Sequence, residues 1–222
     1  MSNEIKVIGF LGVDKYDMIH YISRILKNLS YKVLLVDYSE SKALKNSIPI
    51  PSGLDSSTNI VEYRSVDFSN ELKPDADTIN RYNYILIDFG FQTSHYELKN
   101  CTDIVFVTDL QQHNANRLLN FKIPIIHKYL IIREVIKSKI TADYVTQLLE
   151  PLKVIKGNHY IISQDTIDSR IMIECQYNNK FKFNRISNPF KDLLFDFISL
   201  ITAETNTEKE IKKAYKKAER GI

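Results

Sequence analysis

The sequence predicts an α/β fold with a mostly parallel central sheet and helices on both faces. Strand-like apolar runs alternate along the chain with segments of helical periodicity, which is the pattern of a parallel sheet. These runs are apolar along nearly their whole length, as strands are when helices cover both of their faces. Two of the runs end in a carboxylate, at Asp37 and at Asp88.

The elements can be assigned in chain order from the period of the apolar residues. Strands are expected at 5–10, 32–37, 59–63, 84–88, 103–108, 129–132 and 158–162. Helices are expected at about 18–29, 111–119, 142–149 and 188–202. The polar segments 38–58 and 64–80 are predicted to be loops with short helices, and 171–183 fits either a hairpin or a loop.

The length of 222 residues suits one α/β domain, placed at 1–203, followed by a basic tail at 204–222. Residues 208–222 hold six basic and three acidic side chains, which leaves 24 of each in the rest of the chain. Because the body is neutral, DNA is not expected as a partner. The tail's apolar stripe is thin, so we expect a solvated or frayed helix, with peripheral membrane contact as the alternative.

The sequence also indicates where the protein works. Cys101 and Cys175 are isolated and are expected to be reduced thiols of the core. No apolar run approaches the roughly 20 residues that span a bilayer, and the first residues do not have the pattern of a signal peptide. A cytoplasmic protein is therefore predicted, with recruitment to the inner face of the membrane through the tail as a further possibility.

Three polar segments are expected to meet at one edge of the sheet. The turn over 9–17 follows the first predicted strand, and Asp37 and Asp88 are the last residues of two others. In open parallel sheets ligands bind at the carboxyl ends of the strands. The sequence therefore predicts a binding site at this edge.

Five segments resemble, in their order and spacing, the ParA/MinD family of deviant-Walker P-loop ATPases, which is grouped with CpaE and TadZ of pilus and secretion systems. The segments are IKVIGFLGVDK, KVLLVDYSE, RYNYILIDFGF, CTDIVFVTDL and the closing helix after RISNPF. The resemblance covers about residues 4–202. It implies a P-loop NTPase fold, with ATP and Mg²⁺ as possible ligands.

The family's phosphate loop reads Lys-Gly-Gly-x-Gly-Lys-Thr, and its glycines let backbone N–H groups surround the phosphates. Gly12 and Lys15 match this motif. Lys15 is either a phosphate ligand or a solvated lysine at the start of a helix. The resemblance thus assigns Gly12 and Lys15 to a weak or vestigial nucleotide site.

Four other positions depart from the motif. Phe10 replaces the signature lysine, Leu11 and Asp14 replace glycines, and Tyr16 replaces the threonine that binds Mg²⁺. Phe10 supplies no cation, and Asp14 would set a carboxylate near the phosphates. Since phosphoryl transfer depends on positioned positive charge and metal, these changes predict little or no turnover.

The resemblance assigns the metal side of the site to carboxylates. Asp37 matches the first carboxylate of the family's Asp-x-Asp segment, and Ser39 stands at the second. Asp88 matches the Walker B aspartate, and Gly90 stands where the second switch begins. Asp17 is a further candidate Mg²⁺ ligand beside Asp37 and Asp88. The alternative is that the aspartates only end strands and cap loops.

The function predicted from these residues is a catalytically inactive scaffold that recruits or positions a larger assembly, such as a pilus, secretion or conjugation machine. Protein partners are expected at Tyr38, Phe89 and Phe91, with at least one of the two phenylalanines exposed. No cofactor is expected. The chain could form a homodimer, or a heteromer with an active relative. The alternative is an active Mg·ATP-dependent partitioning or positioning ATPase.

Overall fold

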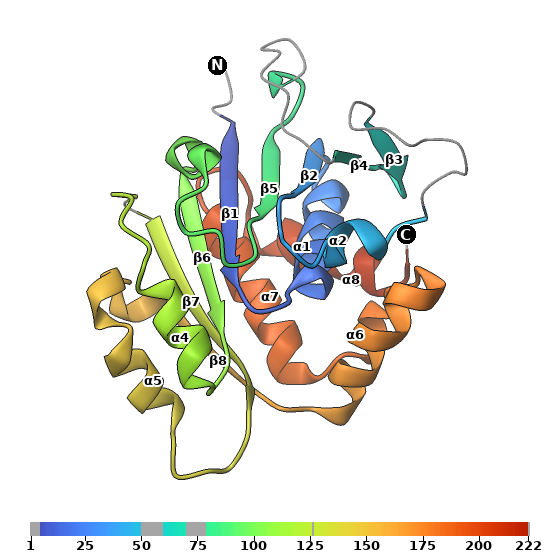
Figure 1. The fold of residues 1–222 in the computed structure, drawn as a ribbon. Coiled ribbons are helices and arrows are strands. Elements are labelled where there is room, and N and C mark those ends of the chain that lie inside the picture. The colour runs from blue at the N-terminus through green and yellow to red at the C-terminus, as the bar shows by residue number, and fades with distance from the viewer. Residues whose placement is uncertain (1–4, 50–59, 70–78, 126, 222) are drawn as a thin grey trace.

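The computed structural model describes residues 5–49, 60–69, 79–125 and 127–221, which fold around one eight-stranded sheet (Figure 1). The strand order is β3-β4-β2-β5-β1-β6-β7-β8. Every pairing is parallel except that of β3 with β4. The predicted α/β class and mostly parallel sheet are therefore confirmed.

The central strand β1 lies between β5 and β6, so the chain crosses over on either side of it. The strands are β1 (Lys6–Gly12), β2 (Val33–Asp37), β3 (Val61–Tyr63), β4 (Val66–Ser69), β5 (Tyr84–Asp88), β6 (Asp103–Thr108), β7 (His127–Val135) and β8 (His159–Ser163). Asp37 and Asp88 pair directly across β2 and β5. The register thus brings the two aspartates together at the carboxyl edge.

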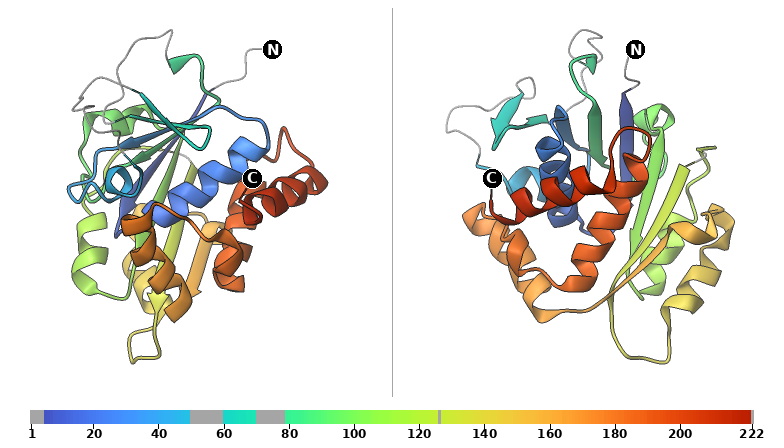
Figure 2. Two further views of the ribbon diagram at one scale, coloured as in Figure 1. Left: turned by 90° about the vertical axis from the view of Figure 1, so that its right-hand side faces the viewer. Right: turned by 180° about the vertical axis from the view of Figure 1, so that it is seen from behind.

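Helices cover both faces of the sheet, as the continuous apolar strands require. One face packs against α1 (Tyr16–Asn28), α2 (Ala43–Asn46), α6 (Thr166–Asn178), α7 (Asn188–Ile201) and α8 (Glu208–Glu219). The other packs against α4 (Gln112–Leu118) and α5 (Ala142–Leu148), with the short helix η1 (Tyr96–Asn100) beside them. The helices α7 and α8 lie behind the sheet in Figure 1 and therefore cross in front of it in the right-hand view of Figure 2, which is seen from behind.

Two segments differ from their sequence predictions. Residues 171–178, which fitted a hairpin or a loop, belong to α6, where the Asp165 side chain caps the first turn by accepting from Ile167 N and Asp168 N. The sequence did not predict this helix because its apolar residues do not lie on one side. Ile173 and Tyr177 are exposed, whereas Ile171 and Cys175 are buried. Residues 66–69, predicted as loop, form β4 beside β2.

The expectation of a solvated or frayed tail is wrong. Thr207 and Glu210 form a reciprocal capping box that starts α8. The helix packs on α1 and α7 through Ile211, Ala214 and Ala218, each 3% exposed or less. Small residues at two of these three positions let the helices approach closely, so a thin apolar stripe suffices.

Both cysteines are buried free thiols, as predicted. In the part of the chain that the structure describes, no helix combines the length and the apolar character needed to cross a bilayer.

Candidate functional site

β1 continues in register with β6 as far as Gly12, so the strand extends into the stretch that matches the family's phosphate loop. Gly12 N donates to Gly90 O at 2.6 Å, and Val13 N donates to Val107 O at 3.0 Å. These two N–H groups are therefore committed to the turn after β5 and to the neighbouring strand β6. Only Val13, Asp14 and Lys15 separate the strand from α1.

Gly12 is required by the sheet itself. Its φ is +122°, and a Cβ built there would lie 1.7 Å from Val107 O. A side chain is excluded both by the backbone conformation and by the close approach of β6. The match of Gly12 to the family motif is thus explained without a bound phosphate.

Lys15 is buried, with 1% of its surface exposed, and does not extend into solvent. Its Nζ lies 2.7 Å from Asp88 Oδ1 and donates to Gly12 O at 3.1 Å and to Val13 O at 3.2 Å. An ammonium has three N–H donors, and three acceptors surround it. The interpretation of Lys15 as a solvated lysine is wrong, and its charge is neutralised within the protein.

Asp37 organises the turn that follows β2. Its Oδ1 accepts from Ser39 N at 2.9 Å and from Ser39 Oγ at 2.5 Å, and its Oδ2 accepts from Lys45 N at 2.9 Å. Burial raises the pKa of the Asp37 carboxyl, the Ser39 hydroxyl opposes the rise, and Asp88 adds to it. Ser39 therefore serves as a partner of Asp37.

Asp88 holds the start of the next loop in the same way. Its Oδ1 accepts from Gly90 N at 2.9 Å in addition to Lys15 Nζ. Gly90 has a φ of +54°, and a Cβ there would lie 2.5 Å from Glu40 Oε2. The structure thus brings Gly12, Lys15, Asp37, Asp88 and Gly90 together at one edge, as the sequence predicted. It joins Gly12, Lys15, Asp88 and Gly90 to one another, while Asp37 bonds to its own turn.

The four positions that depart from the motif are all explained by packing or local bonding. Phe10 and Leu11 are fully buried on opposite faces of the sheet. The hydroxyl of Tyr16 donates to Met172 O in α6 at 2.5 Å, so it does not face the loop. Asp14 is exposed, and its Oδ1 accepts from Ser41 Oγ at 3.3 Å.

Asp17 is not placed to bind a metal with Asp37 and Asp88. Both of its oxygens accept from the guanidinium of Arg133, at 3.0 Å each, and both side chains are buried. Arg133 also donates to Asp14 O at 3.0 Å. The carboxylate that the sequence offered as a Mg²⁺ ligand is thus half of an internal ion pair.

Sequence reasoning missed Arg133. The available signal was its position, since it follows the apolar run Leu130–Ile132 at the carboxyl end of a strand, as Asp37 and Asp88 do in theirs. Among the described residues, no group of three or more His, Cys, Asp or Glu side chains is placed to hold a metal ion.

Aromatic side chains gather beside this edge. Tyr38 stacks on His95 with ring centroids 4.3 Å apart, and His95 stacks on Tyr96 at 4.7 Å. Phe89 lies beneath them, 5.8 Å from Tyr38, and is 0% exposed. The prediction of Phe89 as a partner anchor is therefore wrong, because it is a core residue that supports the stack. Tyr96 is 65% exposed.

Phe91, the other predicted anchor, is half-buried beneath a cation. The guanidinium of Arg117 lies 3.7 Å from the centre of the Phe91 ring and reaches Glu40 at 3.8 Å. We call the surface formed by Tyr38, Phe91, His95 and Tyr96 the aromatic edge.

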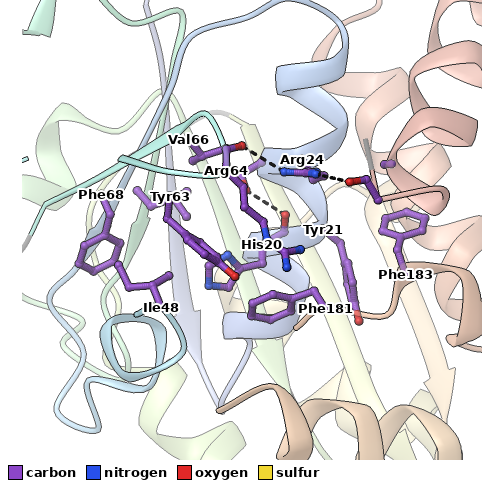
Figure 3. A pocket seen from close by; sticks show the side chains of 14 residues that line it. His20, Tyr21, Arg24, Ile48, Tyr63, Arg64, Val66, Phe68, Phe181 and Phe183 are labelled. Carbon is purple, nitrogen blue, oxygen red and sulfur yellow. Dashed lines mark hydrogen bonds between the residues drawn. The ribbon is translucent and has the colours of Figure 1, made fainter. Parts of the chain in front are cut away.

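A separate hollow lies beside α1, under the β3–β4 hairpin (Figure 3). His20, Tyr63 and Phe181 line it, and Arg24 crosses its rim to donate to Arg64 O at 3.1 Å and Gly221 O at 2.8 Å. Its volume of about 40 Å³ is room for a few waters. Burial lowers the pKa of His20 to about 3, so this histidine is neutral at physiological pH.

Solved structures of ParA and MinD proteins share this fold. MinD in the MinC:MinD cell division complex of Aquifex aeolicus matches with a TM-score of 0.66 and 10% identity, covering 91% of this chain and 98% of that one. The pNOB8 ParA bound to nonspecific DNA matches with a TM-score of 0.61 and 14% identity, covering 91% and 100%. A ParA family ATPase from Chlorobium tepidum TLS matches with a TM-score of 0.53 and 18% identity, covering 96% and 98%.

No protein-family model matches the chain, and no curated protein matches it by sequence. The likeness is therefore one of fold. The chain has the α/β fold of the ParA/MinD P-loop ATPases, as its five motif-like segments implied.

Proposed function

We propose that this protein is a scaffold that keeps the fold of the ParA/MinD positioning ATPases without turning over ATP. The observation that carries the proposal is the environment of Lys15. Its ammonium lies 2.7 Å from Asp88 Oδ1 and donates to two backbone carbonyls, and the Lys15 and Asp88 side chains are both buried. The lysine that the resemblance assigns to the phosphates, and the aspartate it assigns to Mg²⁺, satisfy each other.

Binding Mg·ATP in the manner of the family would require several internal contacts to break together. Lys15 would have to leave Asp88, and Gly12 and Val13 would have to withdraw their N–H groups from Gly90 O and Val107 O. No residue of the loop replaces the cation lost at Phe10. Each lost group of this kind is worth several kcal/mol in transition-state stabilisation, so their joint absence predicts no useful turnover.

Two measurements on the intact chain test this proposal. Isothermal titration with Mg·ATP should give no binding heat up to millimolar nucleotide, and phosphate release should equal that of the double variant Lys15→Met/Asp88→Asn purified in the same way. The double variant removes both partners of the ion pair and so leaves neither charge alone. Micromolar binding of Mg·ATP, or phosphate release by the wild type that the double variant lacks, would establish the alternative of an active positioning ATPase.

The scaffold role requires a protein partner, and the aromatic edge is the surface that we propose for it. Tyr96 is exposed at the end of a stack whose inner members, Phe89 and Tyr38, are fixed by the core. Rigid aromatic side chains bury a large area at low entropic cost, which is why they dominate interface energies. MinD in the matched complex is bound to MinC, which makes a protein partner a natural hypothesis for this fold.

The partner surface can be tested in the cell by a photo-crosslinking amino acid placed at Tyr96. Tyr144 in α5 is the matched control, since it is 54% exposed and lies outside the aromatic edge. We expect one discrete adduct from position 96, absent from position 144 and lost with His95→Ala. Equal adducts from both positions, or none from position 96, would rule out this surface as the docking site.

A further inference from the structure

A second cavity lies at the opposite end of the sheet from Lys15 and Asp88. It is a hollow of about 560 Å³ at the amino ends of β1, β5, β6 and β7, closed on one side by the turn after α7. The right-hand view of Figure 2 shows this turn beside the start of β1. Cavities of this volume are in the range that holds small molecules.

A buried carboxylate with neutral partners lies at the base of the hollow. Asp103 is 3% exposed. Its Oδ2 accepts from Thr102 Oγ1 at 2.7 Å, and its Oδ1 accepts from the Tyr129 hydroxyl at 3.3 Å. Asp103 forms no ion pair with any residue that the structure describes. A buried carboxylate held only by hydroxyls retains acceptor capacity and favours a cation.

A cation lines the same hollow without pairing with Asp103. Lys6 Nζ donates to Ile201 O at 2.8 Å, and the Tyr84 hydroxyl donates to the same oxygen at 3.3 Å. This contact fixes the ammonium on the α7 side and uses one of its three N–H donors. The hollow thus presents a buried carboxylate, Asp103, and a cation, Lys6, that are held by different walls, while the other carboxylate of its lining, Glu204, is exposed to solvent in the turn after α7.

Aromatic rings form the wall near Lys6 and near Asp103. Tyr31 and Tyr84 meet edge to face with centroids 4.9 Å apart, and Tyr129 meets Phe197 in the same way at 5.1 Å. The Tyr31 hydroxyl is anchored by Thr205 Oγ1 at 2.7 Å. Tyrosine rings attract ammonium groups, and side chains fixed in this way lose little entropy on binding.

We propose that this hollow binds a small zwitterion of the amino-acid class, with its ammonium on Asp103 and its carboxylate on Lys6. A ligand with both charges satisfies the two side chains at once. A ligand with one charge would leave the other side chain uncompensated. The site is independent of the nucleotide edge, so it does not depend on the scaffold proposal.

The test is a titration of the intact chain with the twenty free amino acids and glycine betaine, with butylamine and butyrate as single-charge probes. Ring signals of labelled tyrosine, followed by NMR, report whether binding occurs at Tyr84 and Tyr129. We expect at least one zwitterion to shift both signals. Its affinity should fall about tenfold or more in Asp103→Asn and in Lys6→Met, since each removes a charged hydrogen bond.

Lys122→Met is the matched control, because Lys122 also donates to a backbone carbonyl, Leu119 O at 2.9 Å, but lies outside the hollow. The affinity of Lys122→Met for the zwitterion should equal that of the wild type. Asp103→Asn keeps one oxygen that accepts from one of the two hydroxyls, and its NH2 group donates to the oxygen of the other, so it should fold. Absence of shifts with every zwitterion overturns the proposal. The proposal is also overturned if butylamine binds as tightly as the zwitterion and Lys6→Met does not change its affinity.

Discussion

Lys15 and Asp88 form a buried ion pair, with Nζ 2.7 Å from Oδ1 and side chains 1% and 3% exposed. In the ParA/MinD resemblance the first residue would bind phosphate and the second would hold Mg²⁺. Here they link the start of α1 to the end of β5. Disrupting this pair should therefore lower the free energy of unfolding, which the loss of a solvated phosphate-binding lysine would not do.

Removing only Lys15 should destabilise the protein strongly. Lys15→Met leaves the Asp88 carboxylate buried without its counter-ion, and we expect a loss of about 3–5 kcal/mol in the free energy of unfolding. Lys15→Met/Asp88→Asn should recover most of this loss, because neither charge then remains. Urea unfolding of the two variants measures the difference. A single variant as stable as the wild type would show that Lys15 is solvated after all.

Gly12→Ala should also be severely destabilising, whether or not nucleotide is present. The added Cβ would lie 1.7 Å from Val107 O at a φ of +122°, so β1 and β6 must separate. We expect a loss of about 4 kcal/mol or more, or failure to fold. Gly157→Ala is the control, since nothing lies within 4 Å of a Cβ there. Equal thermal stabilities of the two variants would contradict the assignment of Gly12 to the sheet.

The last helix should contribute to the stability of the whole domain. Ile211 is 2% exposed and packs in the core cluster with α1 and α7, so Ile211→Ala should cost about 2–5 kcal/mol. Lys217→Ala, on the exposed side of the same helix, should change stability by about 0.5 kcal/mol or less. Chemical denaturation checks both values. A solvated tail would instead give two equally small effects.

Stability should fall with acidification because of His20. Burial, with a smaller contribution from Arg64, lowers its pKa to about 3, whereas the unfolded chain protonates near the ordinary value of 6.5. Between these values only the unfolded state binds the proton, so stability is complete above about pH 6.5. It is lost at about 1.4 kcal/mol per pH unit as the pH falls towards 3.

Unfolding curves of the wild type and His20→Gln between pH 7 and pH 5 isolate this contribution. The slope of unfolding free energy against pH should be smaller in His20→Gln. The exposed His113 supplies the control, since His113→Gln should keep the slope of the wild type. Parallel slopes for the wild type and His20→Gln would mean that His20 is already protonated in the folded protein.

Much of the fold was predictable because it depends on local period and order. Apolar runs such as Tyr84–Ile87 indicated covered parallel strands, and the aspartates that end them indicated one common edge. The missed elements had weak local signals. α6 exposes Ile173 and Tyr177 opposite a buried Ile171, so its apolar residues do not lie on one side. β4 has four residues in a polar segment.

Sequence by itself determined that Gly12, Lys15, Asp37 and Asp88 would share one edge of a parallel sheet. Each of them ends or follows a strand, and the carboxyl ends of parallel strands lie at the same edge. Only the tertiary structure decided what those residues contact. Asp17 meets Arg133 from a strand more than a hundred residues away, and Phe89 lies under the Tyr38 ring. Burial and pairing depend on the surfaces that other elements bring, and no local pattern encodes them.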